Sequence, residues 1–133
     1  SKGMLDKAQI RNCYDKLIEN ELLTYLESCS SQFDVVVSAD TLIYFGNLTN
    51  VFFETRSALR NDGWFLFTLE VAENENNTTS FTLNSHGRYS HPETYIRKEL
   101  EQAGFRIHSM YKSTLRKEVD KEVAGWIIAA QAV

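Results

Sequence analysis

The sequence predicts an α/β fold with a mostly parallel, twisted sheet that ends in an antiparallel hairpin. Strand-like and helix-like segments alternate along the chain, which favours an α/β architecture. Residues 33–38 include three consecutive valines, a run typical of a parallel strand buried on both faces. The last strand-like segments, residues 105–115 and 123–133, flank a charged connector of hairpin length. The 133 residues are enough for one domain with a core.

The N-terminal elements follow from short local patterns. Ser1 can cap a first helix that has Met4 and Ala8 on one face. Residues 14–18 are a short strand candidate, and the leucines of residues 22–26 form a short helical face.

The middle of the chain predicts a helix, a turn and a strand. Residues 47–60 carry an apolar stripe at helical spacing. Asn61, Asp62 and Gly63 favour a turn, because Asn and Asp tolerate the left-handed region and Gly adopts it freely. Residues 64–69 are predicted to be a second buried strand.

A long polar stretch, residues 72–89, separates that strand from the next helix. A loop of this length in a compact domain is usually functional or disordered. The residues from Ser90 to Glu93 match a capping box with Pro92 in the first turn. A helix is therefore predicted to begin there and to end at Gly104.

Composition disfavours several partners. The net charge is −4 and no stripe dense in Lys or Arg occurs, so no nucleic-acid partner is expected. The longest apolar run, residues 126–130, is too short to span a bilayer, so no membrane partner is expected either. Cys13 and Cys29 are predicted to be unrelated reduced thiols, and the expected location is cytoplasmic.

Several local sequences, in order, resemble class I S-adenosylmethionine-dependent methyltransferases, a family with a Rossmann-like fold. Residues 1–8 are similar to the family's D-x-S-x-x-M-L-x-x-A segment without its leading acid, and residues 33–42 to its fourth-strand motif. Residues 59–64 resemble the L-(K/R)-P-G-G turn before strand five, with Asn-Asp in place of Pro-Gly. Residues 87–91 and 103–105 are similar to a subgroup often fused to tetratricopeptide repeats.

The resemblance covers residues 1–133 as a single partial methyltransferase domain and implies that the family's first two strands are absent. No G-x-G-x-x-G-like loop occurs, although such glycines let the backbone approach the cofactor. The implied activity is transfer of a methyl group from S-adenosylmethionine to an unknown acceptor, which is expected to be a small molecule, and this segment is expected to be inactive alone. The alternative is a non-catalytic remnant or interaction module of the same fold.

Family topology also implies a strand arrangement. The strands at residues 33–38, 64–69, 123–133 and 105–115 are expected to form a contiguous sheet in that order. The strand at residues 14–18 is expected to be detached or re-paired, because its family partner is missing. An open, apolar edge at residues 33–38 invites self-association.

The resemblance implies two groups of cofactor-binding residues. Glu21, with Glu19 as a rival, matches the acid that meets the adenine amino group, since a carboxylate accepts hydrogen bonds. The same acid can instead simply stabilise the start of a helix. Met4 matches an apolar residue on the adenine face, or it packs into the core. The second group follows the valine-rich strand, where ligands bind in parallel sheets: Ala39, Asp40, Thr41 and Leu42. Of these, Asp40 can orient a ligand's amino group or act only as a turn residue.

Candidate substrate-binding residues lie in the loops. Tyr44 is a candidate pocket wall, and His86, Arg88, Tyr89 and His91 are clustered in a loop that tends to cover the substrate in the family. Arg88 can bind a carboxylate or phosphate bidentately, and a histidine can serve as a general base. His91 can alternatively be only a helix-start residue. Two histidines five residues apart without a third ligand do not predict a metal site.

Overall fold

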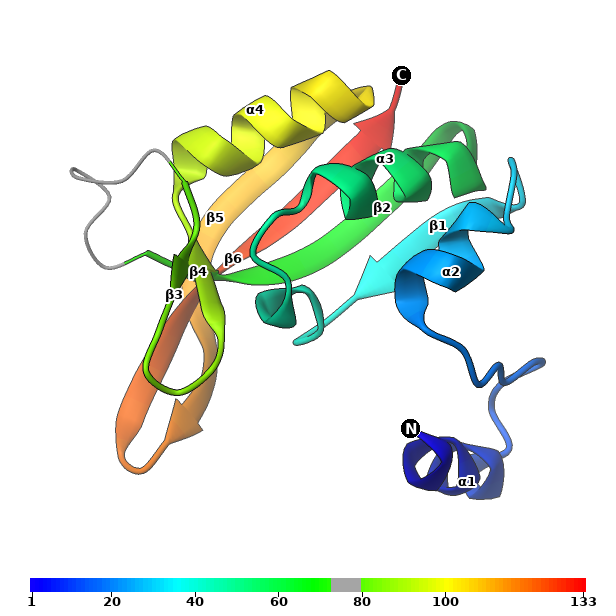
Figure 1. Cartoon of the computed structure of the whole chain (residues 1–133), viewed down its shortest axis with the longest axis horizontal. Coiled ribbons are helices and arrows are strands. Elements are labelled where there is room, and N and C mark those ends of the chain that lie inside the picture. Colours follow the sequence, from blue (N-terminus) through cyan, green and yellow to red (C-terminus); the bar gives the residue numbers. More distant parts are fainter. Residues whose placement is uncertain (73–79) are drawn as a thin grey trace.

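A computed structural model describes residues 1–72 and 80–133 as one α/β unit (Figure 1). None of the helices in this described part has the length and apolar character needed to cross a membrane. The elements in chain order are α1 (Lys2–Arg11), α2 (Leu22–Glu27), β1 (Phe33–Ser38), the short 3-10 helix η1 (Leu42–Tyr44), α3 (Thr49–Ala58), β2 (Leu59–Val71), β3 (Thr82–Leu83), β4 (Tyr89–His91), α4 (Glu93–Ala103), β5 (Phe105–Glu118) and β6 (Lys121–Ala132).

Strand β2 is the centre of a mixed sheet. On one edge it pairs in parallel with β1 and then, near its end, with β4. On the other edge it pairs antiparallel with β6, which pairs antiparallel with β5. The predicted order β1, β2, β6, β5 is thus confirmed. The prediction of a mostly parallel sheet is wrong for the described residues, because β3–β4, β2–β6 and β5–β6 are all antiparallel.

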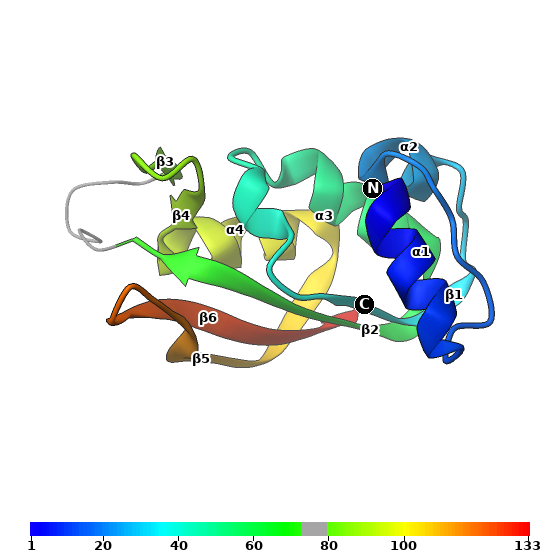
Figure 2. The ribbon, with the colours of Figure 1, turned by 90° about the horizontal axis from the view of Figure 1, so that it is seen from below.

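The helices α3 and α4 cover one face of the sheet, while strands alone form the opposite face in the described structure (Figure 2). Alternate side chains of β1 therefore have different surroundings. Val35 and Val37 are 48% and 69% exposed on the uncovered face, whereas Val36 packs against the core. The prediction that β1 is buried on both faces is wrong for this reason.

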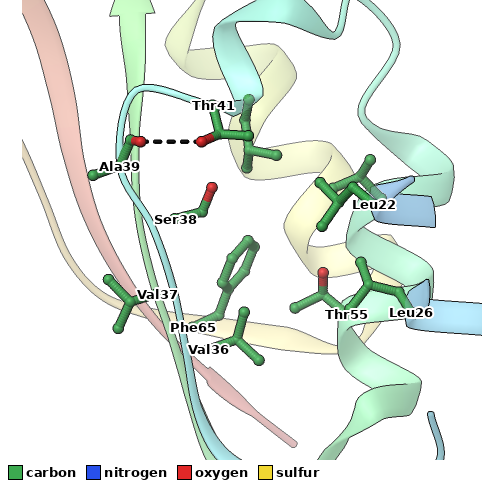
Figure 3. Close-up of a pocket in the computed structure, with 11 residues that line it drawn as sticks. Leu22, Leu26, Val36, Val37, Ser38, Ala39, Thr41, Thr55 and Phe65 are labelled. Atoms are coloured by element: carbon green, nitrogen blue, oxygen red, sulfur yellow. Dashed lines mark hydrogen bonds between the residues drawn. The ribbon is translucent and has the colours of Figure 1, made fainter. Parts of the chain in front are cut away.

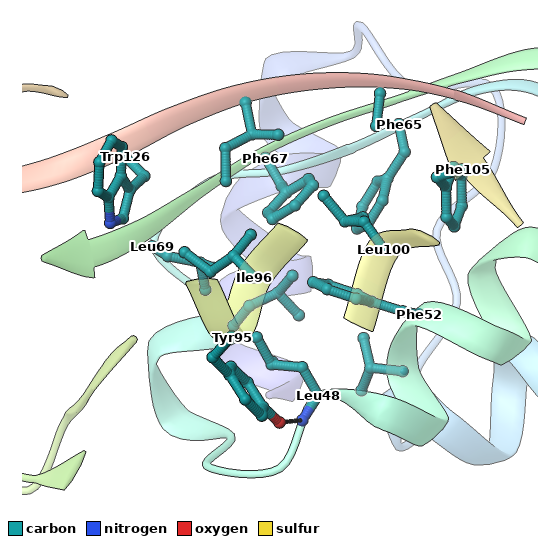
Figure 4. Packing of buried hydrophobic residues seen from close by; sticks show 14 of the residues in the cluster. Leu48, Phe52, Phe65, Phe67, Leu69, Tyr95, Ile96, Leu100, Phe105 and Trp126 are labelled. Atoms are coloured by element: carbon teal, nitrogen blue, oxygen red, sulfur yellow. Dashed lines mark hydrogen bonds between the residues drawn. The ribbon is translucent and has the colours of Figure 1, made fainter. Parts of the chain in front are cut away.

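An aromatic and aliphatic core fills the space between the sheet and the two helices (Figure 4). Phe65 and Phe67 on β2 stack with ring centroids 4.2 Å apart, and Phe52 from α3 meets Phe65 edge-on at 5.8 Å. From α4, Ile96 and Leu100 are fully buried. Each such side chain contributes roughly 1.5–3 kcal/mol through its removal from water.

The N-terminal segment packs little. The Ser1 hydroxyl accepts a hydrogen bond from the Met4 amide at 3.3 Å, so the predicted cap of α1 is confirmed. However, α1 has no buried residue. Residues 14–18 form no strand, because no neighbouring strand within the described chain pairs with them. The expected detachment of this segment is correct, but its predicted strand conformation is not.

Two predicted boundaries differ for reasons of backbone pairing. Asp62 has the left-handed conformation (φ 64°), but it lies inside β2. The pairing of β1 with β2 is irregular here, because Phe33 pairs with Leu59 and Val35 pairs with Trp64. The expected turn is therefore a bulge in a longer strand.

The start of α4 also differs from the prediction. Ser90 is paired to Glu70 as part of β4, so it is not free to act as a capping residue. Pro92 occupies the cap position without a side-chain hydrogen bond. The predicted capping box is therefore wrong. The predicted end of the helix is confirmed, because Gly104 has φ 94°.

The terminal hairpin is confirmed, and its strands extend through the charged connector to a turn at Val119 and Asp120. Opposite Ala124 and Val123, next to Gly125, β5 has a register irregularity between Thr114 and Arg116. The Leu115 side chain between them covers Gly125 so closely that no Cβ would fit there.

This close approach predicts that Gly125→Ala destabilises the hairpin. The added Cβ would lie 2.6 Å from the Leu69 carbonyl oxygen and closer still to Leu115. Overpacking of this kind costs about 1–3 kcal/mol, measurable as the free energy of unfolding in urea. Gly3→Ala is the matched control, because nothing lies within 4 Å of a Cβ there. Equal stability of the two variants would contradict this packing.

Candidate functional site

An apolar pocket of about 340 Å³ lies at the carboxyl end of β1, on the helix-covered face of the sheet (Figure 3). The side chains of Leu22 and Leu26 on α2 and Thr55 on α3 face Val36 and Phe65 across it. The complete lining is Leu22, Leu26, Val36, Val37, Ser38, Ala39, Thr41, Leu42, Val51, Thr55 and Phe65. Its size is within the usual range for small-molecule sites, about 300–1,000 Å³.

Three of the four predicted cofactor residues after β1 border this pocket: Ala39, Thr41 and Leu42. The Thr41 hydroxyl donates a hydrogen bond to the Ala39 carbonyl oxygen at 3.1 Å, which fixes the turn. Asp40 does not line the pocket. It has a left-handed backbone (φ 50°), and its amide donates to the Thr68 hydroxyl at 3.0 Å.

The other two predicted cofactor residues are not brought to the pocket. Glu21 caps α2, and its carboxylate accepts hydrogen bonds from the amides of Leu23 at 3.1 Å and Thr24 at 2.9 Å. These backbone donors, Thr24 first, lower the pKa of Glu21. The carboxylate thus has the helix-start role that was the alternative. Met4 is 73% exposed on α1 and lines no part of the pocket.

A buried carboxylate that the sequence analysis missed lies at the end of β2. Glu70 is only 4% exposed, and its carboxylate accepts from Arg88 Nε at 2.7 Å and from Arg116 Nη2. Removing a carboxylate from water is costly unless charged donors compensate it. The two guanidinium groups provide that compensation.

Three further contacts extend this arrangement into an ion-pair cluster of Asp40, Glu70, Arg88, Arg116 and Glu118. Arg116 Nη1 donates to Asp40 at 2.9 Å. The Glu118 carboxylate accepts from Arg116 Nε at 2.9 Å and from Arg88 Nη2 at 2.8 Å. These two donors, Arg116 first, lower the pKa of Glu118. Asp40 connects the cluster to the turn that borders the pocket, so the two features are adjacent.

Of the predicted loop residues, the structure brings Arg88 and His86 to the cluster. His86 Nε2 lies 3.8 Å from a Glu70 carboxylate oxygen. Tyr89 packs edge-on against Phe81, with ring centroids 5.8 Å apart. Tyr44 is 63% exposed and does not line the pocket.

His91 is fully buried in β4, so it is not the helix-start residue that was considered as an alternative. Its Nε2 lies 3.0 Å from the carbonyl oxygens of both Phe45 and Gly46, so Nε2 must carry the proton and donate to them. Burial lowers the pKa of His91 below its ordinary value of 6.5. His91 is thus a neutral anchor for the loop after η1, without access to solvent.

Glu70 could have been found in the sequence. It directly follows the apolar run W-F-L-F-T-L, and an acid at the end of a buried strand requires a charged partner. Arg116 and Glu118 carry no such signal, because they belong to a connector in which nearly every residue is charged.

No protein-family model and no curated protein matches this sequence. Solved structures do match. An S-adenosylmethionine-dependent methyltransferase from Methanosarcina mazei aligns with a TM-score of 0.73 at 12% identity, over 100% of this chain and 79% of that one. Magnesium protoporphyrin IX methyltransferase from Synechocystis PCC 6803, solved with bound S-adenosylhomocysteine, aligns with a TM-score of 0.69 at 16% identity, over 100% of this chain and 61% of that one.

A third match is a (4+2)-cyclase, with a TM-score of 0.75 at 13% identity over 96% of this chain and 61% of that one. At such low identities the likeness concerns the fold. The chain has the fold of the class I S-adenosylmethionine-dependent methyltransferases. The cyclase indicates that proteins of this fold are not confined to one reaction.

The burial of His91 predicts a specific pH dependence of stability. Its pKa is lower in the folded protein than in the unfolded chain, so the unfolded chain binds more protons between those two values. The contribution to stability is present above about pH 6.5 and is lost as the pH falls toward the folded value.

We expect the free energy of unfolding in urea to fall less between pH 7.5 and 5.5 in His91→Gln than in the unsubstituted protein. His108→Gln, which removes an exposed histidine and keeps His91, should retain the original dependence. If His91→Gln and His108→Gln show the same slope, His91 does not control this pH range.

Proposed function

We propose that the chain is the C-terminal part of an S-adenosylmethionine-dependent methyltransferase and that it contributes the wall of the cofactor site that follows β1. The observation that supports this proposal most strongly is the position of the apolar pocket. In a fold shared with methyltransferases, it lies at the carboxyl end of β1, where ligands bind in open α/β sheets. S-adenosylhomocysteine is bound in one structure of that fold.

The described residues fit one part of this cofactor and not the rest. Leu22, Leu42, Val36 and Phe65 offer apolar surface for a flat ring or for a thioether. The nearest candidate carboxylates are already engaged, because Glu21 caps α2 and Asp40 binds Arg116. The sequence carries no G-x-G-x-x-G-like loop to approach the rest of the ligand. We therefore infer that this chain alone binds the cofactor weakly and is inactive.

When bound, S-adenosylmethionine supplies a methyl group activated by its sulfonium. The turn at residues 38–42 would exclude water beside the cofactor and fix its position. Methyl transfer depends largely on such positioning, and a general base is optional. The acceptor would lie toward the carboxyl end of β2, between the β3–β4 hairpin and the tip of β5–β6, which project from the same end of the molecule (Figures 1 and 2).

A non-catalytic interaction module is the second candidate. The edge of β1 opposite β2 pairs with no strand in the described structure, and Val35 and Val37 are exposed beside it. Such an edge can recruit another strand, including one from a second copy of this chain. Sedimentation that shows a monomer at high concentration would count against self-association.

The cofactor proposal predicts weak binding of S-adenosylhomocysteine by this chain, with a dissociation constant on the order of 1 mM, measurable by calorimetry. Ser38→Phe should reduce that binding at least roughly tenfold, because Ser38 faces the pocket and a phenyl ring would fill much of it.

Val35→Phe is the matched control, because it places the same ring on the opposite face of β1. Binding should be unchanged in this variant. If Ser38→Phe binds as well as the control does, the pocket is not the cofactor site.

A further inference from the structure

The Glu118 carboxylate occupies a site formed by two arginines. One oxygen accepts from Arg116 Nε at 2.9 Å and the other from Arg88 Nη2 at 2.8 Å. A carboxylate held through both oxygens by guanidinium groups is the geometry by which proteins recognise carboxylate ligands. Here the carboxylate comes from the chain itself.

The two arginines are held in place independently of Glu118. Each also contacts the carboxylate of Glu70, whose side chain is 6% exposed at the end of β2. Arg116 is held further by Asp40. Removing Glu118 would therefore leave two oriented guanidinium groups at the same place.

Glu118 is held less firmly than Glu70. Its side chain is 40% exposed, and it is the last residue of β5 before the turn at Val119 and Asp120. Val119 is 97% exposed, so its side chain makes little contact with the part of the chain that the structure describes. The side chains of Arg88 and Arg116 are only 14% and 22% exposed, but an incoming carboxylate that takes both contacts of Glu118 leaves neither guanidinium group unpaired.

We propose that Arg88 and Arg116 bind a carboxylate of the methyl acceptor and that Glu118 occupies its place until the acceptor arrives. The identity of the ligand as the methyl acceptor rests on the proposed function. The existence of a carboxylate site rests only on the ion-pair cluster. The exchange replaces one carboxylate with another, so the charge balance of three carboxylates and two guanidinium groups is unchanged. Asp40 would then place the acceptor beside the turn that borders the pocket.

Acetate binding to the whole chain, without cofactor, tests the proposal. The side-chain Nε–Hε signals of Arg88 and Arg116 report binding by NMR at constant ionic strength. Glu118→Ala should bind acetate roughly tenfold more tightly than the unsubstituted protein, because the internal competitor is gone and every molecule is competent to bind. Glu122→Ala is the matched control, since it removes an exposed acid from the same hairpin. The carboxylate of Glu122 accepts a hydrogen bond from Thr114 and contacts neither arginine in the described structure.

Tighter acetate binding in Glu118→Ala but not in Glu122→Ala supports the site. Loss of the tighter binding in the double variant Glu118→Ala, Arg116→Lys supports it further, since Lys keeps the charge but not the planar guanidinium geometry. The same acetate affinity in Glu118→Ala and Glu122→Ala would overturn it. So would a response to inorganic phosphate without one to acetate. Because no cofactor is present, failure here leaves the cofactor result unaffected, and failure of cofactor binding leaves this result unaffected.

Discussion

The ion pairs of Glu70 with Arg88 and Arg116 are the interaction on which the functional end of the molecule depends. Glu70 lies at the end of β2, Arg88 comes from the segment before β4, and Arg116 comes from β5. A buried carboxylate left without these partners would be strongly destabilising, since breaking such a pair costs about 3–5 kcal/mol. One acid therefore determines where the β3–β4 hairpin and the terminal hairpin meet. Through Arg116 it also reaches Asp40 and the turn after β1.

That meeting point is possible because β2 is paired on both edges. Its β6 edge supports the terminal hairpin, and the irregularity between Thr114 and Arg116 lies where β5 turns Arg116 toward Glu70. Its other edge holds β1 first and β4 afterwards, so the pocket and the ion-pair cluster lie at the ends of neighbouring strands. Helices cover a single face, which leaves Val35 and Val37 exposed. The side that carries the pocket is thus well packed, whereas the opposite side of β1 is not.

The positions of several strands could be predicted from the sequence, because apolar runs such as residues 33–38 and the terminal segments have strong local signals. Their order was predicted from the topology of the family that the sequence resembles. The conformation of residues 14–18 could not be predicted, since a strand requires a partner that the described chain does not offer. Of the residues predicted to bind the cofactor, Ala39, Thr41 and Leu42 border the pocket, and their role in binding stays a prediction. The cluster around Glu70 was not predicted, because the contacts of Glu70 and Asp40 with the two arginines join residues 18 to 76 positions apart and leave no local pattern. Glu21 is the opposite case, because its role as the cap of α2 involves only the neighbouring residues Leu23 and Thr24.

The central claim is that the pocket at the carboxyl end of β1 receives the adenosyl cofactor. Backbone amide NMR of the chain, titrated with S-adenosylhomocysteine, tests this claim most directly. The largest shifts are expected in residues 38–42 and in Leu22, which border the pocket from two elements. Shifts concentrated instead on Val35, which does not line the pocket, or on α1, or no shifts at millimolar ligand, would contradict it.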